Sequence, residues 1–369
     1  MRSAKSTFFK SCYTASALFF ITWLTTCFLK MDAGTGWLLA LSFVCLAIAL
    51  RGSIKLKGYW YSIAILGVAT VAMYYPYLFR TVGSKDASFF IPFMLQIIMF
   101  GMGTELSIKD FAQVMKMPKG VIVGIICHYT IMPLVGFTVA HLFNFPGEIA
   151  AGIILIGCCP SGLASNVMCY LAKANLALSV SVTTVSTLLA PVLTPLLMKL
   201  LGGSYVNVDF WKMFWDITNI VILPIAAGLV FHYLVRGKLK WLDKAMPVFS
   251  MIGIALVLLV ITAAGRDNLL KVGGLLIIAT FLHNTTGYFL GYWSARLLKF
   301  PEKDCRTIAL EVGMQNAGLA SALAKAMGKI ATVGLASVIF GTMMNVSGSF
   351  LANWWHNQDP RDVEDKKHD

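Results

Sequence analysis

Long stretches without a single charged residue recur along this chain, and they restrict its possible folds more than any other feature. They cover residues 120–147, 149–172, 174–198, 245–265, 272–295, 312–324 and 330–358. A membrane-spanning helix needs about 20 mostly apolar residues, and several of these stretches reach that length. With 58% hydrophobic and 13% charged residues, the composition is that of an all-α polytopic membrane protein and not of a soluble one.

The basic residues indicate orientation and not a nucleic-acid partner, although the formal net charge is +13. If the N-terminus is cytoplasmic and the helices alternate in direction, 21 of the 30 Lys and Arg residues fall on the cytoplasmic side. Membrane proteins concentrate Lys and Arg in their cytoplasmic loops. We therefore expect a multi-pass protein of the cell inner (plasma) membrane, surrounded by lipid bilayer, with both termini in the cytoplasm.

The apolar stretches and the charged loops between them predict about twelve transmembrane helices. The expected helices cover residues 12–29, 36–50, 59–79, 88–104, 120–141, 149–172, 175–200, 213–234, 246–263, 272–295, 305–327 and 331–354. We expect two of them to be broken. Pro160 and Gly162 interrupt the sixth, because proline removes a backbone donor and clashes with the preceding turn. Gly313 and Gly318 loosen the eleventh.

Glu311 is the most informative single residue. It lies inside a long apolar segment together with the amides Gln315 and Asn316, and its nearest charged neighbours in sequence are Arg306 and Lys325. An ionisable side chain at membrane depth is costly, so it marks a functional site by default. We interpret Glu311 as the centre of an ion site in a transporter.

The two halves of the chain resemble each other. Residues 162–165 and 318–321 share the run Gly-Leu-Ala-Ser, and His128 and His283 stand at nearly the same offset. From residue 59 onward, five expected helices precede the linker at 202–212 and five follow it. An odd number of helices per half gives the halves opposite orientations. The pattern predicts inverted five-helix repeats, with a binding site where the two broken helices cross.

Specific motifs then identify a family. The chain resembles the bile acid:sodium symporter family over about residues 59–355, in the runs 99–103, 157–168, 283–284, 311–316 and 345–349. The resemblance implies two inverted five-helix repeats that form a core domain, with two crossed broken helices, and a mobile panel domain. The helical hairpin before residue 59 is additional to that pattern.

The implied domain boundaries follow the expected helices. They are an extra N-terminal helical hairpin at 1–58, a first repeat at 59–204 (panel 59–104, core 119–200), a second repeat at 205–356 (panel 213–263, core 272–354) and a charged cytoplasmic tail at 357–369. We interpret the extra hairpin as a peripheral scaffold or an oligomer contact.

The resemblance also implies two groups of sodium ligands. The first group is Ser165, Asn166, Ser179, Thr183 and Glu311. The second group is Glu311 again, the main-chain carbonyls near Val312 and Met314, the side chain of Gln315, and the position of His128. Hard oxygen ligands suit an alkali cation. We expect one or two sodium ions as the coupling ions.

His128 departs from the family pattern, which usually has a glutamine oxygen at this position. An imidazole offers nitrogen, a poor partner for sodium. Three outcomes stay open. The second site persists through other oxygens while His128 bonds a helix backbone or Glu311, or the carrier uses one sodium ion, or it is partly coupled to protons because histidine titrates near neutral pH.

The expected substrate is a monovalent organic anion. Half-helix N-termini carry partial positive charge and unpaired N–H groups, which favour a carboxylate or another anion. The candidate contacts are Ser161, Gly162, Leu163, Asn316, Ala317, Gly318 and Asn345. Bile acids, pantoate and related carboxylates or sulfonates all fit this argument, because a family does not determine a substrate.

The function expected from these residues is sodium-coupled symport of the anion by alternating access at the crossed helices. The alternatives are a proton-coupled or uniport carrier of the same substrates, or a membrane anion sensor that does not transport. We do not expect an enzyme, because the sequence contains neither a His-Glu-x-x-His nor a Gly-x-Ser-x-Gly run.

Overall fold

The structure is a computed structural model that describes residues 2–29, 35–53, 56–106, 113–235 and 240–358. Most of this part of the chain is α-helical. The helices are α1 (Arg2–Phe28), α2 (Thr35–Arg51), α3 (Trp60–Tyr74), α4 (Ile91–Glu105), α6 (Pro118–Leu142), α7 (Gly147–Cys158), α8 (Ala164–Leu171), α9 (Leu176–Leu197), α10 (Phe210–Ile217), α11 (Leu223–Val235), α12 (Lys240–Leu297), α13 (Glu302–Gly313), α14 (Ala317–Ala326) and α15 (Val333–His356).

Short elements connect or extend the helices. The antiparallel strands β1 (Thr81–Val82) and β2 (Lys85–Asp86) lie between α3 and α4. Single turns of 3₁₀-helix are η1 (Lys57–Tyr59), η2 (Pro76–Leu78) and η3 (Ala87–Phe90), and π-helical turns are η4 (Met198–Gly202) and η5 (Thr218–Ile222). Some of the 21 Lys and Arg residues expected on the cytoplasmic side lie outside the described residues, as do residues 359–369 of the expected tail. They are Lys55, Lys109, Arg236, Lys238, Arg361, Lys366 and Lys367.

Length and hydropathy make this a multi-pass membrane protein. Seven helices of the described residues are long and apolar enough to cross a membrane, and α2, α3 and α7 are shorter apolar helices. Large apolar side chains lie on the outer surface, among them Phe8, Leu18 and Phe28. An exposed apolar surface of this extent is typical of a protein whose solvent is lipid.

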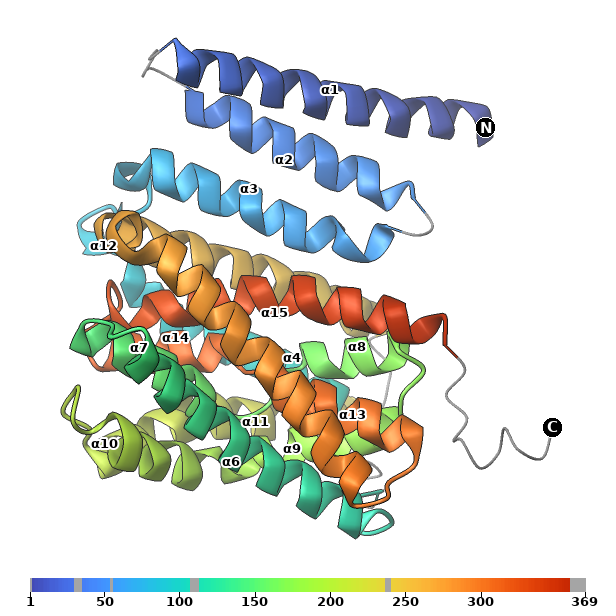
Figure 1. The fold of residues 1–369 in the computed structure, drawn as a ribbon, viewed down its shortest axis with the longest axis vertical. Coiled ribbons are helices and arrows are strands. Elements are labelled where there is room, and N and C mark those ends of the chain that lie inside the picture. The colour runs from blue at the N-terminus through green and yellow to red at the C-terminus, as the bar shows by residue number, and fades with distance from the viewer. Residues whose placement is uncertain (1, 30–34, 54–55, 107–112, 236–239, 359–369) are drawn as a thin grey trace.

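The first three helices lie side by side in one layer at one side of the molecule (Figure 1). α1 packs on α2, α2 packs on α3, and α3 packs on α12. Polar contacts fix the layers, since the Ser16 and Ser42 hydroxyls lie 3.2 Å apart and Trp23 Nε1 donates to Tyr74 Oη at 3.2 Å. The hairpin α1–α2 is thus attached to the rest of the protein mainly through α3.

The structure differs from the expected helices at residues 246–263 and 272–295, which belong to one continuous helix, α12. At 1.5 Å per residue, its 58 residues would measure about 87 Å if straight, far more than a bilayer. Figure 1 shows two arms that meet at the end marked α12. Arg266 Nε donates to Met73 O at 2.7 Å, so its charge is satisfied without a break in the helix. Charged residues alone do not end a helix, which is why the expected loop is missing.

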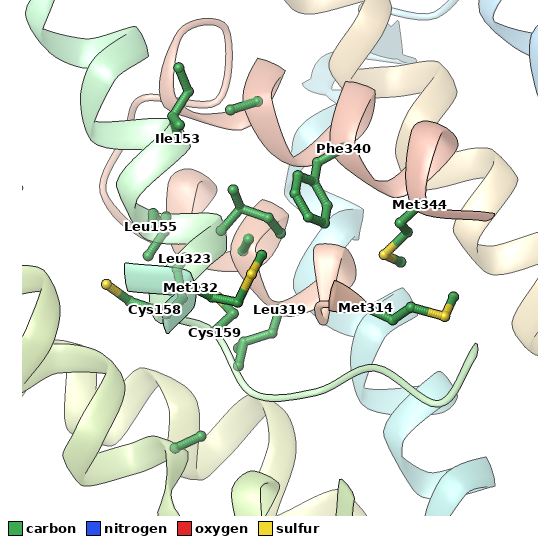
Figure 2. Packing of buried hydrophobic residues seen from close by; sticks show 14 of the residues in the cluster. Met132, Ile153, Leu155, Cys158, Cys159, Met314, Leu319, Leu323, Phe340 and Met344 are labelled. Carbon is green, nitrogen blue, oxygen red and sulfur yellow. The ribbon is translucent and has the colours of Figure 1, made fainter. Parts of the chain in front are cut away.

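A buried cluster of apolar side chains holds the helices of the second half around α7. Figure 2 shows Ile153 and Leu155 of α7 beside Leu323 of α14 and Phe340 of α15. Met132 of α6 lies in the same cluster and is fully buried. The packing encloses the segments at which α7 and α13 end.

Two glycines let α4 and α11 approach closely. A Cβ atom on Gly103 would lie 2.2 Å from Ile225 O, and one on Gly228 would lie 2.2 Å from Phe100 O. Any larger residue at either position would push the two backbones apart. Small residues serve helix contacts in membranes in the same way.

Candidate functional site

The candidate site lies where two interrupted helices cross. α7 ends at Cys158 and the chain resumes as α8 at Ala164. α13 ends at Gly313 and the chain resumes as α14 at Ala317. The interruptions fall at the Pro160 and Gly313 positions where proline and glycine predicted them. Each one frees main-chain groups that an uninterrupted helix would pair internally.

The two short linking segments bond to each other like antiparallel strands. Gly162 N–H donates to Met314 O at 3.1 Å, and Asn316 N–H donates to Pro160 O at 2.8 Å. A Cβ on Gly162 would lie 2.5 Å from the main-chain oxygen of Gln315. Glycine is therefore required for this close crossing.

Glu311 lies in a cluster of side-chain oxygens beside the crossing. It is fully buried near the end of α13. Its Oε1 lies 2.5 Å from Ser165 Oγ and 2.5 Å from Ser179 Oγ, and its Oε2 accepts from Thr183 Oγ1 at 2.8 Å. Asn166 Oδ1 lies 2.7 Å from Ser179 Oγ. The structure thus brings together every member of the first expected ligand group.

This cluster has the chemistry of a site for a small monovalent cation. A hydroxyl has one proton, yet Ser179 Oγ faces both Glu311 Oε1 and Asn166 Oδ1. Acceptor oxygens therefore outnumber the hydrogens available to them. The ligands are hard oxygens, and Glu311 carries the one ionisable group among them, so a single sodium ion would balance its charge.

The other hydroxyls of α9 serve different purposes. Ser181, Ser186 and Thr187 bond carbonyl oxygens of their own helix. Such back-bonding is the ordinary use of Ser and Thr in an apolar helix. Ser179 and Thr183, four residues apart, share the face that points at Glu311.

The second expected group is arranged differently. Val312 O accepts from Gln315 Nε2 at 3.0 Å, and Met314 O accepts from Gly162 N–H. Gln315 Oε1 is buried and has no hydrogen-bond partner in the described part of the chain. Met314 O also lies 3.3 Å from the Ser161 hydroxyl, so both of its lone pairs are used, whereas Val312 O keeps one.

His128 joins the two broken helices. Its ring is fully buried on α6, with Nδ1 2.9 Å from Glu311 O and Nε2 2.9 Å from Cys159 O. Both partners are carbonyl oxygens, which only accept hydrogen bonds. A neutral ring donates to one of them and a charged ring to both.

The candidate substrate contacts are only partly free. Gly162 N–H is used in the crossing, Ala317 N–H lies 3.1 Å from Gln315 O, and Asn345 Nδ2 donates to Gly341 O at 2.7 Å. The N–H groups of Leu163 and Ala164 have no partner among the described residues, and no side chain caps α8.

The remaining candidates lie close to the same crossing. The Ser161 hydroxyl lies 3.3 Å from Met314 O. Asn316 caps α14 by accepting from Leu319 N–H at 3.0 Å, while its Nδ2 makes no hydrogen bond in the part that the structure describes. Gly318, like Asn316 and Leu163, is half-buried. The free donors are thus at the first turns of α8 and α14.

Two supporting residues were not assigned a role from sequence. Asn284 Nδ2 donates to Gly313 O at 2.8 Å and so stabilises the end of α13, and Ser347 Oγ lies 2.5 Å from Asn284 Oδ1. Both belong to runs that carry the family resemblance, and that was the one available signal.

A buried arginine joins α13 to α15. Arg306 is 1% exposed and donates to Glu302 Oε1 at 2.9 Å and to Trp355 O at 3.1 Å.

Comparison with known proteins identifies the family. Residues 92–272 match the sodium bile acid symporter family. The chain is 44% identical over 299 residues to the uncharacterized sodium-dependent transporter YocS of Bacillus subtilis, covering 81% of this chain and 91% of that one. It is 34% identical to the probable sodium/metabolite cotransporter BASS1, chloroplastic, of Arabidopsis thaliana, over 73% of this chain and 68% of that one. It is 33% identical to the human ileal sodium/bile acid cotransporter, over 66% of this chain and 71% of that one. These similarities make the chain a member of the sodium bile acid symporter family.

Proposed function

We propose that this protein is a symporter that couples the movement of one small organic anion to sodium. The observation that carries the proposal is the buried oxygen cluster around Glu311, which unites side chains from α8, α9 and α13. Named relatives are sodium-dependent transporters or sodium cotransporters, which supports the same coupling ion.

The anion would bind at the first turns of α8 and α14. The free N–H groups of Leu163 and Ala164 and the free amide of Asn316 are donors without an acceptor. Two helix N-termini pointing to one place create a positive potential that suits a carboxylate or a sulfonate. Bile acids, pantoate and related acids are the substrates to test first, because one relative is named for bile acid and others for unspecified metabolites.

Transport would follow from movement of a core domain (119–200 and 272–354) against a panel domain (59–104 and 213–263). All members of the Glu311 cluster belong to the proposed core, so sodium and anion would move with it as one body. The hairpin α1–α2 packs on α3 of the proposed panel and would enlarge the stationary part. Both termini would be cytoplasmic, consistent with the start of α1 and the end of α15 at the same end in Figure 1.

Uptake into liposomes tests the proposal. Purified protein is reconstituted and supplied with radiolabelled pantoate, taurocholate or small keto acids under an inward sodium gradient, with choline replacing sodium as control. We expect concentrative uptake that needs sodium and that is lost in Glu311→Gln. Uptake driven equally well in choline would indicate a uniporter or proton coupling, and binding without uptake would indicate a sensor.

A further inference from the structure

We infer that the protein moves a single sodium ion with each anion, because His128 replaces an oxygen ligand that the family resemblance implies for a second ion. The inference rests on the proposed function and deepens it, since it concerns the charge carried in each transport cycle. It is based on how each main-chain oxygen at the crossing is used.

The first step is the position of the ring. His128 extends from α6 to the break in each broken helix, and each of its nitrogens lies 2.9 Å from a carbonyl oxygen. Glu311 O is on α13 and Cys159 O follows α7. The ring thus lies between a carbonyl near the end of α13 and a carbonyl just after α7, where a cation would otherwise contact both.

The second step is the chemistry of the ring. An imidazole presents N–H or a nitrogen lone pair in every protonation state, and never an oxygen. A neutral ring donates its one N–H to Glu311 O or to Cys159 O, and that N–H then takes a place on the oxygen that a cation would use. A hard cation such as sodium prefers oxygen ligands, so His128 excludes the ion from its side of the crossing.

The third step is the set of oxygens that remain. Met314 O accepts from Gly162 N–H and from the Ser161 hydroxyl, so both of its lone pairs are used, while Val312 O accepts from Gln315 Nε2 and keeps one lone pair. Gln315 Oε1 is the one buried side-chain oxygen here without a partner in the described residues. Val312 O and Gln315 Oε1 alone do not form a cation site, because hard cations take several oxygens. Around Glu311, by contrast, four other side chains supply oxygen within one cluster.

The consequence is electrical. One sodium ion with one monovalent anion carries no net charge, whereas two sodium ions with the same anion carry one positive charge. At steady state, a potential of 100 mV would change accumulation by about 50-fold in the second case and not at all in the first. The two stoichiometries are therefore separated by a measurement that needs no variant.

The experiment uses the intact protein in liposomes, with a potassium diffusion potential set by valinomycin. We expect sodium-driven uptake by the wild type to be indifferent to the potential, and His128→Gln, which supplies an amide oxygen, to become stimulated by a negative interior. His283→Gln is the matched control, since that buried ring bonds Met132 O on α6 and touches neither break through its nitrogens. It should behave as the wild type does.

A second readout avoids transport altogether. The thermal stabilisation of purified protein is followed against sodium concentration, where the slope against log concentration reports the number of ions bound. We expect a slope for about one ion in the wild type and about two in His128→Gln. A wild type that binds two ions, or whose uptake responds to the potential, overturns the inference and leaves the symport proposal intact. Absence of any sodium effect in the wild type would instead refute the proposed function.

Discussion

At the scale of single residues, the phase of a helix decides which hydroxyls belong to the site. Ser179 and Thr183 reach Glu311, while Ser181 lies between them in sequence and bonds Ala177 O at 2.8 Å. Four residues on a helix return to nearly the same face, and two residues turn to the opposite side. Neighbouring serines of equal size and burial thus have unrelated roles.

This difference predicts the effect of removing each hydroxyl. Ser179→Ala should weaken apparent sodium affinity about tenfold, because a hydrogen bond or ligand to a charged group contributes on the order of 1.5–3 kcal/mol. Ser181→Ala, its matched control, should change sodium affinity less than about twofold, because it loses a bond to its own helix. Sodium-dependent thermal stabilisation measures both. Equal losses in the two variants would mean that the Glu311 cluster does not bind the ion.

The residues of the Glu311 cluster could be predicted from sequence, whereas the use of the main-chain oxygens could not. Glu311 stands out by itself as a carboxylate in an apolar segment, whereas Ser165, Asn166, Ser179 and Thr183 were expected because of the family resemblance. The bond from Gly162 N–H to Met314 O and the contact between His128 and Glu311 O join residues 152 and 183 positions apart, so they depend on how distant segments meet in space. The bond from Asn284 Nδ2 to Gly313 O could not be predicted either, because it also depends on how distant segments pack.

At the scale of secondary-structure elements, breaks and bends were predictable to different degrees. Proline and glycine act on their own backbone, so the interruptions after Cys158 and Gly313 follow from local chemistry. The continuity of α12 does not, because Arg266 and Asp267 suggest a loop until a partner such as Met73 O accepts from the arginine. The continuity of α12 therefore depends on tertiary contacts and could not be predicted from its own residues.

The close crossing of the broken helices predicts an intolerance of side chains at one position. Gly162→Ala would place a Cβ 2.5 Å from Gln315 O, so the segments must separate, and we expect loss of uptake with a lower melting temperature. Gly274→Ala is the matched control, since a Cβ there meets nothing within 4 Å and α12 gains a better helix former. Melting curves and uptake are measured on both. A Gly162→Ala protein with normal uptake would show that the crossing is wider in the working transporter.

At the scale of the whole molecule, a polar contact joins the proposed panel to the proposed core at the end opposite the chain termini. Lys325 Nζ of α14 donates to Ser88 Oγ of η3 at 2.5 Å. Hydrogen bonds from Ser88, with a smaller contribution from the charge of Lys325, hold the pKa of Asp86 below its ordinary value. Asp86 therefore stays ionised at neutral pH and reinforces the Lys325 contact. Alternating access would require the contact between Lys325 and Ser88 to break in every cycle.

The last prediction tests that requirement by tying the two domains together. In a background without the partly exposed Cys12, Cys27 and Cys45, the pair Ser88→Cys and Lys325→Cys is joined by a short, reducible bifunctional thiol reagent. We expect uptake to stop while sodium still stabilises the protein, because the Glu311 cluster lies within the proposed core, and a reductant should restore uptake.

The matched control for this cross-link lies at the same end of the molecule. Lys329 Nζ bonds Glu148 Oε1 in another partly buried lysine contact, but both residues belong to the proposed core. Joining Glu148→Cys to Lys329→Cys should leave uptake unchanged, because no relative movement is expected between them. If both cross-links stop uptake, or neither does, the division into panel and core at these residues is wrong. The proposed movement of the core against the panel, with sodium bound in the core, predicts that uptake is lost only in the protein cross-linked between positions 88 and 325.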